Sequence, residues 1–294
     1  MWQLCFGVGY SSYSSAIDTP IRHSIQPLDP IEVAGHADLN AIRRSAVRVN
    51  AEFVIDKLNI IMDRECFVSQ MKSTIKVTPI KRWTNQKYAS HFETLQACGV
   101  LKECKANEVQ WYSPYFSVAK DTFFDRSIFN GSRMSTLFNV PTPVNTLDAP
   151  RVLKMICDLN RINGYLGLSF ICGDLRHWFH QLKLHKDIHR YFGLAMGDRS
   201  YVWCTVPMGW SHSPCIAQAI CWQMLCHFEV GEVNYLNIND CKISPFFVPI
   251  HNVSGEYVGF ATVYYDNYII CCSDFGIIDI LYEFEETPSF STLS

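Results

Sequence analysis

Two apolar, β-rich runs late in the chain flank a single polar dipeptide. Residues 257–265 and 268–272 consist mostly of aromatic, β-branched and small apolar residues, and Asp266-Asn267 lies between them. Because Asp and Asn tolerate the backbone of tight turns, the pattern predicts a β-hairpin with this dipeptide at its tip. A carboxylate in apolar surroundings is unfavourable unless a cation or hydrogen-bond donors compensate it. At this point, Asp266 can be interpreted either as an ordinary turn residue or as a functional carboxylate.

A second carboxylate follows another apolar run. Residues 165–172 predict a strand, and Asp174 comes at its end. A sheet can bring two such carboxylates together, and hard oxygen ligands suit a pair of Mg²⁺ or Mn²⁺ ions whose shell is completed by substrate phosphates. Spacing alone does not pair Asp174 with Asp266, because any two aspartates could be paired in this way.

The rest of the chain predicts a mixture of helices and strands without strict alternation, which favours an α+β fold. The first 30 residues are rich in Ser, Tyr and Pro and predict a mobile leader. Residues 231–255 predict a loop-rich insertion. The prolines at 141, 143 and 150 predict a subdomain boundary. Helical patterns cover residues 37–66, 85–98, 152–162 and 213–228, and strand patterns cover 112–118 and 123–129.

Composition narrows the class of protein. Hydrophobic residues make up 48% of the 294, which excludes wholesale disorder, and no apolar run approaches the roughly 18 residues of a membrane span. Thirteen scattered cysteines and a start without a basic region predict reduced thiols and an intracellular protein without membrane contact.

The net charge of −3 hides an asymmetry. From Glu229 onward there are ten acidic residues and one basic residue, a local charge of −9, so the first 228 residues carry +6. Basic stretches at 72–105 and 151–190 suit an anionic polymer held on one side of the protein. Solvated helix faces explain the same charges equally well.

A third element, residues 206–214, has the sequence Val-Pro-Met-Gly-Trp-Ser-His-Ser-Pro. Its glycine allows backbone to approach a substrate closely, and Pro214 is suited to a helix start. Taken alone, the segment is equally a plain junction between a loop and a helix.

In order and content, the three elements resemble motifs A, B and C of reverse transcriptases: Asp-Leu-x-x-x-Phe from residue 174, Pro-x-Gly-x-x-x-Ser-Pro from 207, and Tyr-x-Asp-Asn from 264. Upstream, residues 95–101, 113–120 and 126–128 resemble the fingers of retroelement polymerases. The resemblance spans about residues 79–273. The Trp- and His-rich first motif and the Asn of the third resemble VIPER-like tyrosine-recombinase retrotransposons.

This resemblance implies a right-hand polymerase fold with fingers and a palm, the palm being an antiparallel sheet packed on helices. It divides the chain into an N-terminal leader and helical segment (1–70), a fingers-like region (71–145) and a palm-like region (146–294). Only 28 residues follow Asp266. We therefore expect a chain that ends before a thumb and has weak or no activity.

The resemblance also implies residue roles. Asp174 and Asp266 would bind the metal ions, and Phe179 would exclude a ribose 2′-OH. Lys120 and Arg126 would meet the triphosphate, and Met208 and Gly209 would lie under the template base and the incoming nucleotide. Asn267 stands where a second Asp is expected in motif C, and it keeps a carbonyl oxygen but loses a charge. Trp178 stands where a small residue is usual, which crowds the neighbourhood of Phe179.

The implied reaction is template-directed addition of deoxynucleoside triphosphates to a primer 3′-OH on an RNA or DNA template. The rival hypotheses are a catalytically dead remnant that binds nucleic acid or a protein, and an unrelated α+β protein. A zinc site at the histidines following Asp174 is a further, weaker alternative, because this run crosses a predicted strand-to-helix transition. Those histidines are His177, His180, His185 and His189.

Overall fold

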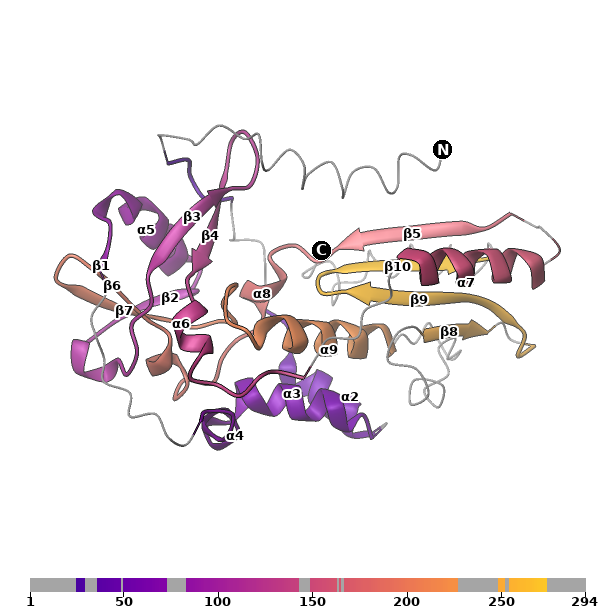
Figure 1. Cartoon of the computed structure of the whole chain (residues 1–294), viewed down its shortest axis with the longest axis horizontal. Coiled ribbons are helices and arrows are strands. Elements are labelled where there is room, and N and C mark those ends of the chain that lie inside the picture. Colours follow the sequence, from indigo (N-terminus) through magenta and orange to yellow (C-terminus); the bar gives the residue numbers. More distant parts are fainter. Residues whose placement is uncertain are drawn as a thin grey trace.

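The structure is a computed structural model that describes residues 25–29, 36–48, 50–72, 83–142, 149–162, 164, 167–226, 248–251 and 254–273. Figure 1 shows an elongated molecule, with sheets towards both ends of the long axis and helices between and around them. The mixture of helices with antiparallel and mixed sheets confirms the predicted α+β class.

The α-helices of the described residues are α2 (Leu39–Arg48), α3 (Glu52–Met62), α4 (Arg64–Ser69), α5 (Ala89–Ala97), α6 (Ser132–Ser135), α7 (Ala149–Ile162), α8 (Trp178–Gln181) and α9 (Ser213–Cys226). The 3-10 turns are η1 (Gln86–Tyr88), η2 (Ala106–Glu108) and η3 (His189–Tyr191). The strands are β1 (Trp83–Thr84), β2 (Leu101–Cys104), β3 (Tyr115–Ala119), β4 (Asp125–Phe129), β5 (Ser169–Asp174), β6 (Gly193–Met196), β7 (Arg199–Trp203), β8 (Val248–His251), β9 (Tyr257–Tyr264) and β10 (Asn267–Cys272).

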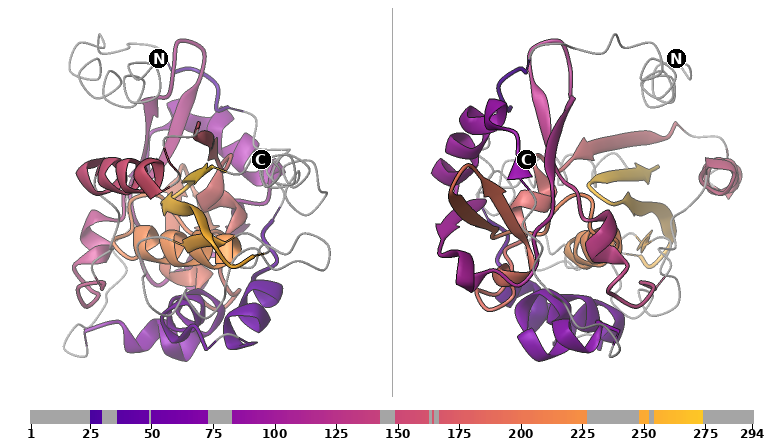
Figure 2. Two further views of the ribbon diagram at one scale, coloured as in Figure 1. Left: turned by 90° about the vertical axis from the view of Figure 1, so that its right-hand side faces the viewer. Right: turned by 60° about the vertical axis from the view of Figure 1, so that its left-hand side comes forward.

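The sheet that carries both aspartates has the strand order β5-β10-β9-β8 and is antiparallel throughout. Cys271 and Phe260 lie opposite each other and pack in one cluster with residues of α7. The next pair, Ile270 and Ala261, belongs to the main core together with residues of α9. Because side chains alternate along a strand, α7 and α9 cover opposite faces of this sheet, as Figure 2 shows.

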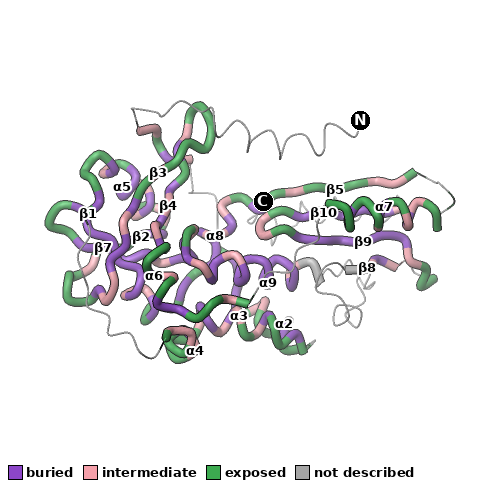
Figure 3. The backbone as a smooth tube through the Cα atoms, in the orientation of Figure 1, coloured by how far each residue is buried: buried purple, intermediate pink, exposed green. Residues whose placement is uncertain are grey.

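Burial differs sharply across this sheet. Strand β9 is almost continuously buried, whereas β5 is an edge strand with mostly exposed or half-buried residues (Figure 3). Asp174 is the last residue of β5. The edge position therefore presents this carboxylate to a cavity instead of burying it in the core.

The predicted helical pattern over residues 37–66 is confirmed, and the structure divides it among α2, α3 and α4. Asn50 takes a left-handed backbone with a φ of 52°, which ends the first segment. Asp63 takes an extended backbone and caps α4 by accepting a hydrogen bond from the Cys66 N–H.

The predicted hairpin of β9 and β10 is confirmed, but its turn lies at residues 265–266, because Asn267 already pairs with Tyr264 as the first residue of β10. The two strands predicted at 112–118 and 123–129 pair with each other as β3 and β4. The pattern predicted as helical at 85–98 forms η1 followed by α5, and Gly99, with a φ of 70°, follows the helix.

The sheet β1-β6-β7-β2 was not predicted as a unit. β2 pairs antiparallel with β7, which lies about 100 residues later, and β1 pairs parallel with β6. Strands from both sides of the predicted boundary at residue 145 therefore share one sheet. Pairing over such distances leaves no local signal in the sequence.

Two loop predictions need correction. Residues 25–29 of the predicted leader are ordered against the β3–β4 hairpin, because Leu28 is buried and bridges Asp125. Residues 248–251 of the predicted insertion form β8, the outer strand beside β9. The rest of the leader before residue 25, and residues 231–247 of the insertion, lie outside the described residues.

Among the helices of the described residues, none is long and apolar enough to cross a membrane.

Candidate active site

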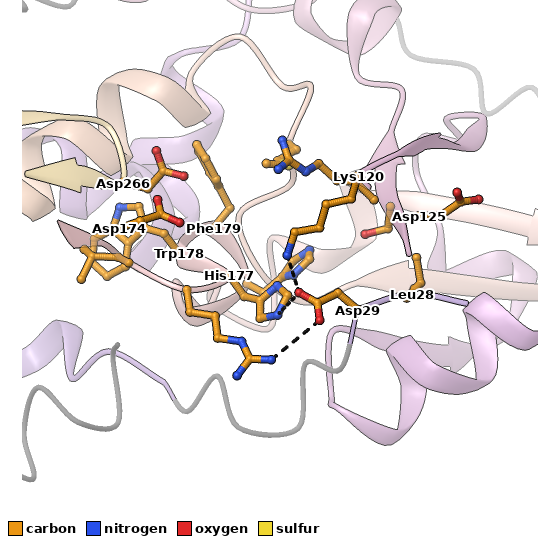
Figure 4. Close-up of a pocket in the computed structure, with 15 residues that line it drawn as sticks. Leu28, Asp29, Lys120, Asp125, Asp174, His177, Trp178, Phe179 and Asp266 are labelled. Carbon is orange, nitrogen blue, oxygen red and sulfur yellow. Dashed lines mark hydrogen bonds and ion pairs between the residues drawn. The ribbon is translucent and has the colours of Figure 1, made fainter. Parts of the chain in front are cut away.

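Asp174 and Asp266 lie on neighbouring strands at one end of their sheet. The register of β5 and β10 places Asp174 opposite Asn267, and the N–H of Leu175 donates a hydrogen bond of 2.7 Å to the Asp266 carbonyl oxygen. Both side chains line the same cavity, and Figure 4 shows their carboxylates side by side. The pairing that spacing could not decide is thus made by antiparallel strand register.

The cavity has a volume of about 110 Å³. It collects residues from segments that are far apart in the sequence. Its lining consists of Leu28, Asp29, Lys120, Asp125, Arg126, Ser127, Asp174, Leu175, Arg176, His177, Trp178, Phe179, His180, Met208 and Asp266. Of the eight predicted site residues, six line it, and Gly209 and Asn267 do not.

The electrostatics of the two carboxylates are those of a site with excess negative charge. Burial raises the pKa of Asp174, and the neighbouring charge of Asp266 raises it further, while Arg126 and Lys120 oppose the shift. Burial also raises the pKa of Asp266, against hydrogen bonds and the charge of Arg126. Because burial and a like charge both disfavour ionisation, a bound cation would relieve a real electrostatic cost.

Asn267, the residue in place of the second Asp expected in motif C, contacts the Asp266 carboxylate. It is exposed at the start of β10, and its side-chain amide donates a hydrogen bond of 3.1 Å to the Asp266 carboxylate. This hydrogen bond helps to hold the Asp266 pKa down. In this arrangement Asn267 orients a carboxylate.

Lys120 and Arg126 come from the β3–β4 hairpin, which approaches the carboxylates from the other side of the cavity. Lys120 directly follows β3, and Arg126 pairs with Val118 in the hairpin register. Both cations lower the pKa of Asp174. The hairpin therefore brings positive charge to the carboxylates without forming part of their sheet.

Phe179 lies in α8, five residues after Asp174, and is half-buried. Its ring packs against the main core while the residue lines the cavity. Trp178 is almost fully buried, and its indole N–H donates to the Ala217 carbonyl oxygen at 3.4 Å. The larger ring is thus anchored on α9.

Met208 lines the cavity, and Gly209 beside it sits at a close backbone approach. Gly209 has a φ of 104°, and a Cβ atom there would lie 2.3 Å from the Phe129 carbonyl oxygen. Ser213 holds the same loop by donating a hydrogen bond of 2.7 Å to the Pro207 carbonyl oxygen. Only glycine fits this position without displacing the end of β4.

The sequence prediction missed Asp29, and it considered His177 only as part of a zinc alternative. The Asp29 carboxylate contacts Lys120, and it lies 3.4 Å from His177 Nε2 and 3.7 Å from an Arg176 nitrogen. Arg176 and His177 come two and three residues after Asp174, the last residue of β5. Basic residues so close to a candidate metal-binding carboxylate are a sequence signal for a binding site. Asp29 is about 145 residues earlier in the chain, and no local pattern marks it.

Two carboxylates with raised pKa values supply the oxygen ligands that Mg²⁺ or Mn²⁺ prefers. Among the described residues, no group of three or more His, Cys, Asp and Glu side chains is placed to hold a metal ion. Asp174 and Asp266 would thus hold such ions with the help of water and substrate oxygens.

No protein-family model matches the chain, and a search of curated proteins finds no matching relative.

Proposed function

We propose that this protein is a reverse transcriptase-like polymerase domain that adds deoxynucleotides to a primer 3′-OH on an RNA or DNA template. One observation carries the proposal: six residues chosen from motif order alone line one cavity. They come from the β3–β4 hairpin, the end of β5, α8, the loop before α9 and the β9–β10 turn. A chance set of motif matches would not be expected to converge in this way.

In this proposal, the sheet β5-β10-β9-β8 with α7 and α9 is the palm, and the β3–β4 hairpin belongs to the fingers. Asp174 and Asp266 hold two divalent ions. When bound, such ions lower the pKa of an attacking hydroxyl and stabilise the charge on a leaving pyrophosphate. The raised pKa values of the two carboxylates support this assignment, because Arg126 and Lys120 offset the cost of ionisation only in part and a bound cation would offset more of it.

The other lining residues then have distinct tasks. Lys120 and Arg126 contact the triphosphate, where charge-assisted hydrogen bonds stabilise the transferring group. Phe179 occupies the space that a ribose 2′-OH would need. Met208, on the loop that Gly209 keeps close to β4, contacts the base pair that forms.

Primer extension tests the proposal. The purified chain is supplied with a labelled DNA primer on RNA and on DNA templates, with Mg²⁺ or Mn²⁺. We expect weak metal-dependent addition of deoxynucleotides, which becomes undetectable or falls by at least about 10²-fold in Asp174→Asn and Asp266→Asn. Asp158→Asn, which removes a half-buried carboxylate on α7 outside the cavity lining, is the matched control and should leave extension unchanged.

Equal activity in the two site variants would show that the carboxylates are not the metal ligands. Tight binding of a primer–template duplex without extension under either metal would instead favour a remnant that only binds nucleic acid. Neither extension nor duplex binding would overturn the proposed function.

A further inference from the structure

The segment of residues 25–29 is held in place by buried groups. Leu28 is 6% exposed and forms a parallel bridge with Asp125 in β4. The Asp125 N–H donates to the Pro27 carbonyl oxygen at 2.9 Å, and the Gln26 N–H donates to the Asp125 carboxylate at 3.3 Å. The buried residue Asp125 therefore holds this segment through both its backbone N–H and its carboxylate.

A buried histidine provides a second anchor. His91 of α5 is 1% exposed, and its Nε2 lies 2.6 Å from the Gln26 carbonyl oxygen. Its Nδ1 lies 3.1 Å from the hydroxyl of Tyr115 in β3. Since buried polar groups with satisfied hydrogen bonds specify one arrangement, the segment has a defined path past the cavity.

This path ends with Asp29 among basic side chains from two other elements. The Asp29 side chain is 13% exposed and contacts Lys120 from the hairpin, together with Arg176 and His177 from the turn after β5. Figure 4 shows the Asp29 carboxylate between the Lys120 ammonium and the residues that follow Asp174. An internal carboxylate therefore occupies a place built for negative charge.

A second observation points to a ligand at the same place. His180 lines the cavity and is 8% exposed, yet neither of its ring nitrogens has a hydrogen-bond partner among the described residues. Its ring stacks on His177, with centroids 6.1 Å apart and planes 22° from parallel. Unpartnered polar atoms beside a basic cluster indicate an incomplete site.

We propose that Asp29 is a built-in competitor for an oligophosphate-binding site formed by Lys120, Arg176 and His177. An incoming oligophosphate group, such as that of a nucleoside triphosphate, must displace the Asp29 carboxylate before it can contact these basic side chains. The relevance to nucleotides rests on the proposed function, whereas the competition itself does not. The anchors at Asp125 and His91 keep Asp29 close, so its effective concentration at the site is high.

Binding of inorganic tripolyphosphate, measured by calorimetry without metal, primer or template, tests this inference. Competition lowers the apparent affinity by the fraction of molecules in which the site is open. We expect Asp29→Asn, which keeps the side-chain shape and removes its charge, to bind tripolyphosphate about 5–50-fold more tightly than the parent chain. Asp158→Asn removes the same charge from α7 and should change nothing.

Competition must be separated from a general effect of local charge. The comparison is repeated in a Lys120→Met background, which removes one partner of Asp29. If Asp29 competes by pairing with Lys120, Asp29→Asn increases the tripolyphosphate affinity less in the Lys120→Met background than in the parent chain. If Asp29 acts only through its long-range charge, the increase is the same in both backgrounds. Asp29→Ser provides a second variant should Asp29→Asn fail to fold, as judged by its thermal unfolding.

Equal tripolyphosphate affinity in the parent chain and the Asp29 variants would overturn the inference, and so would an absence of binding in all of them. A parallel titration with a deoxynucleoside triphosphate shows whether the base and sugar add to the oligophosphate contact. Because no measurement here involves primer extension, a failure of the proposed polymerase activity would be seen separately.

Discussion

Asp174 lies directly opposite Asn267 across the paired strands β5 and β10, and Asp266, one residue before Asn267, turns its carboxylate to the same cavity. The amide of Asn267 donates to Asp266, so the third polar residue of the cluster orients a carboxylate. Two carboxylates and one amide thus share the end of the sheet, and the ionisation of each aspartate depends on its neighbours.

The first prediction concerns the pH dependence of stability. Both aspartates have pKa values raised above 3.8 in the folded protein, so folding favours their protonated forms. The resulting destabilisation is absent below about pH 3.8, the unfolded value, and is complete above the raised folded pKa. Without metal, Asp266→Asn should be more stable than the parent chain near neutral pH, and the difference should vanish at low pH.

Urea unfolding at a series of pH values measures this difference. Asp158 is the control of opposite sign, because its hydrogen bond with Lys154 lowers its pKa. Asp158→Asn should therefore lose a small stabilisation that the parent chain has above pH 3.8. In addition, Mn²⁺ should raise the melting temperature of the parent chain more than that of Asp266→Asn. A pH-independent difference for Asp266→Asn would show that folding does not raise the Asp266 pKa.

The second prediction concerns the choice of sugar. Phe179→Val shortens the side chain beside Asp174 and opens the space where a 2′-OH would lie. The ratio of ribonucleotide to deoxynucleotide incorporation should rise by about 10–100-fold. Phe170→Val, on the exposed part of β5 outside the cavity lining, is the control. An unchanged ratio in Phe179→Val would leave Phe179 as a packing residue.

The third prediction concerns Asn267. Asn267→Asp replaces a hydrogen-bond donor by a third carboxylate, which repels Asp266 until a cation binds. We expect lower stability without metal and about 10-fold tighter Mn²⁺ binding by calorimetry, because the number of charged ligands sets affinity. Asn267→Ser removes the same hydrogen bond without adding charge and should not tighten binding. Equal Mn²⁺ affinities in all three proteins would argue against a metal site at this end of the sheet.

The fourth prediction concerns the backbone approach at Gly209. Gly209→Ala places a Cβ atom 2.3 Å from the Phe129 carbonyl oxygen and imposes a side chain on a φ of 104°. Unfolding should become easier by about 2–4 kcal/mol, the sum of backbone strain and steric overlap. Gly255→Ala, with a φ of 80° and nothing within 4 Å, isolates the strain and should cost about 1 kcal/mol. Similar losses of unfolding free energy in both variants would show that the end of β4 moves away from the added Cβ atom at little cost.

The sequence by itself determined the local elements that carry the site. Apolar, β-rich runs predicted the strands β3, β4, β9 and β10 and the turn between the last two, and the apolar run before Asp174 predicted β5. Such runs are readable because the preference of β-branched and aromatic residues for strands acts within a few residues. The order of the motifs also selected six residues that line one cavity.

Only the tertiary structure decided which groups meet. The register of β5 on β10 set Asp174 beside Asp266, and the path of residues 25–29 brought Asp29 to Lys120. The pairing of β2 with β7 joined segments on either side of residue 145. These contacts link residues about 90–100 positions apart, and they depend on sheet register and on burial of Asp125 and His91. A one-dimensional pattern does not contain such information, because the free energy that selects these contacts arises only when the whole core packs.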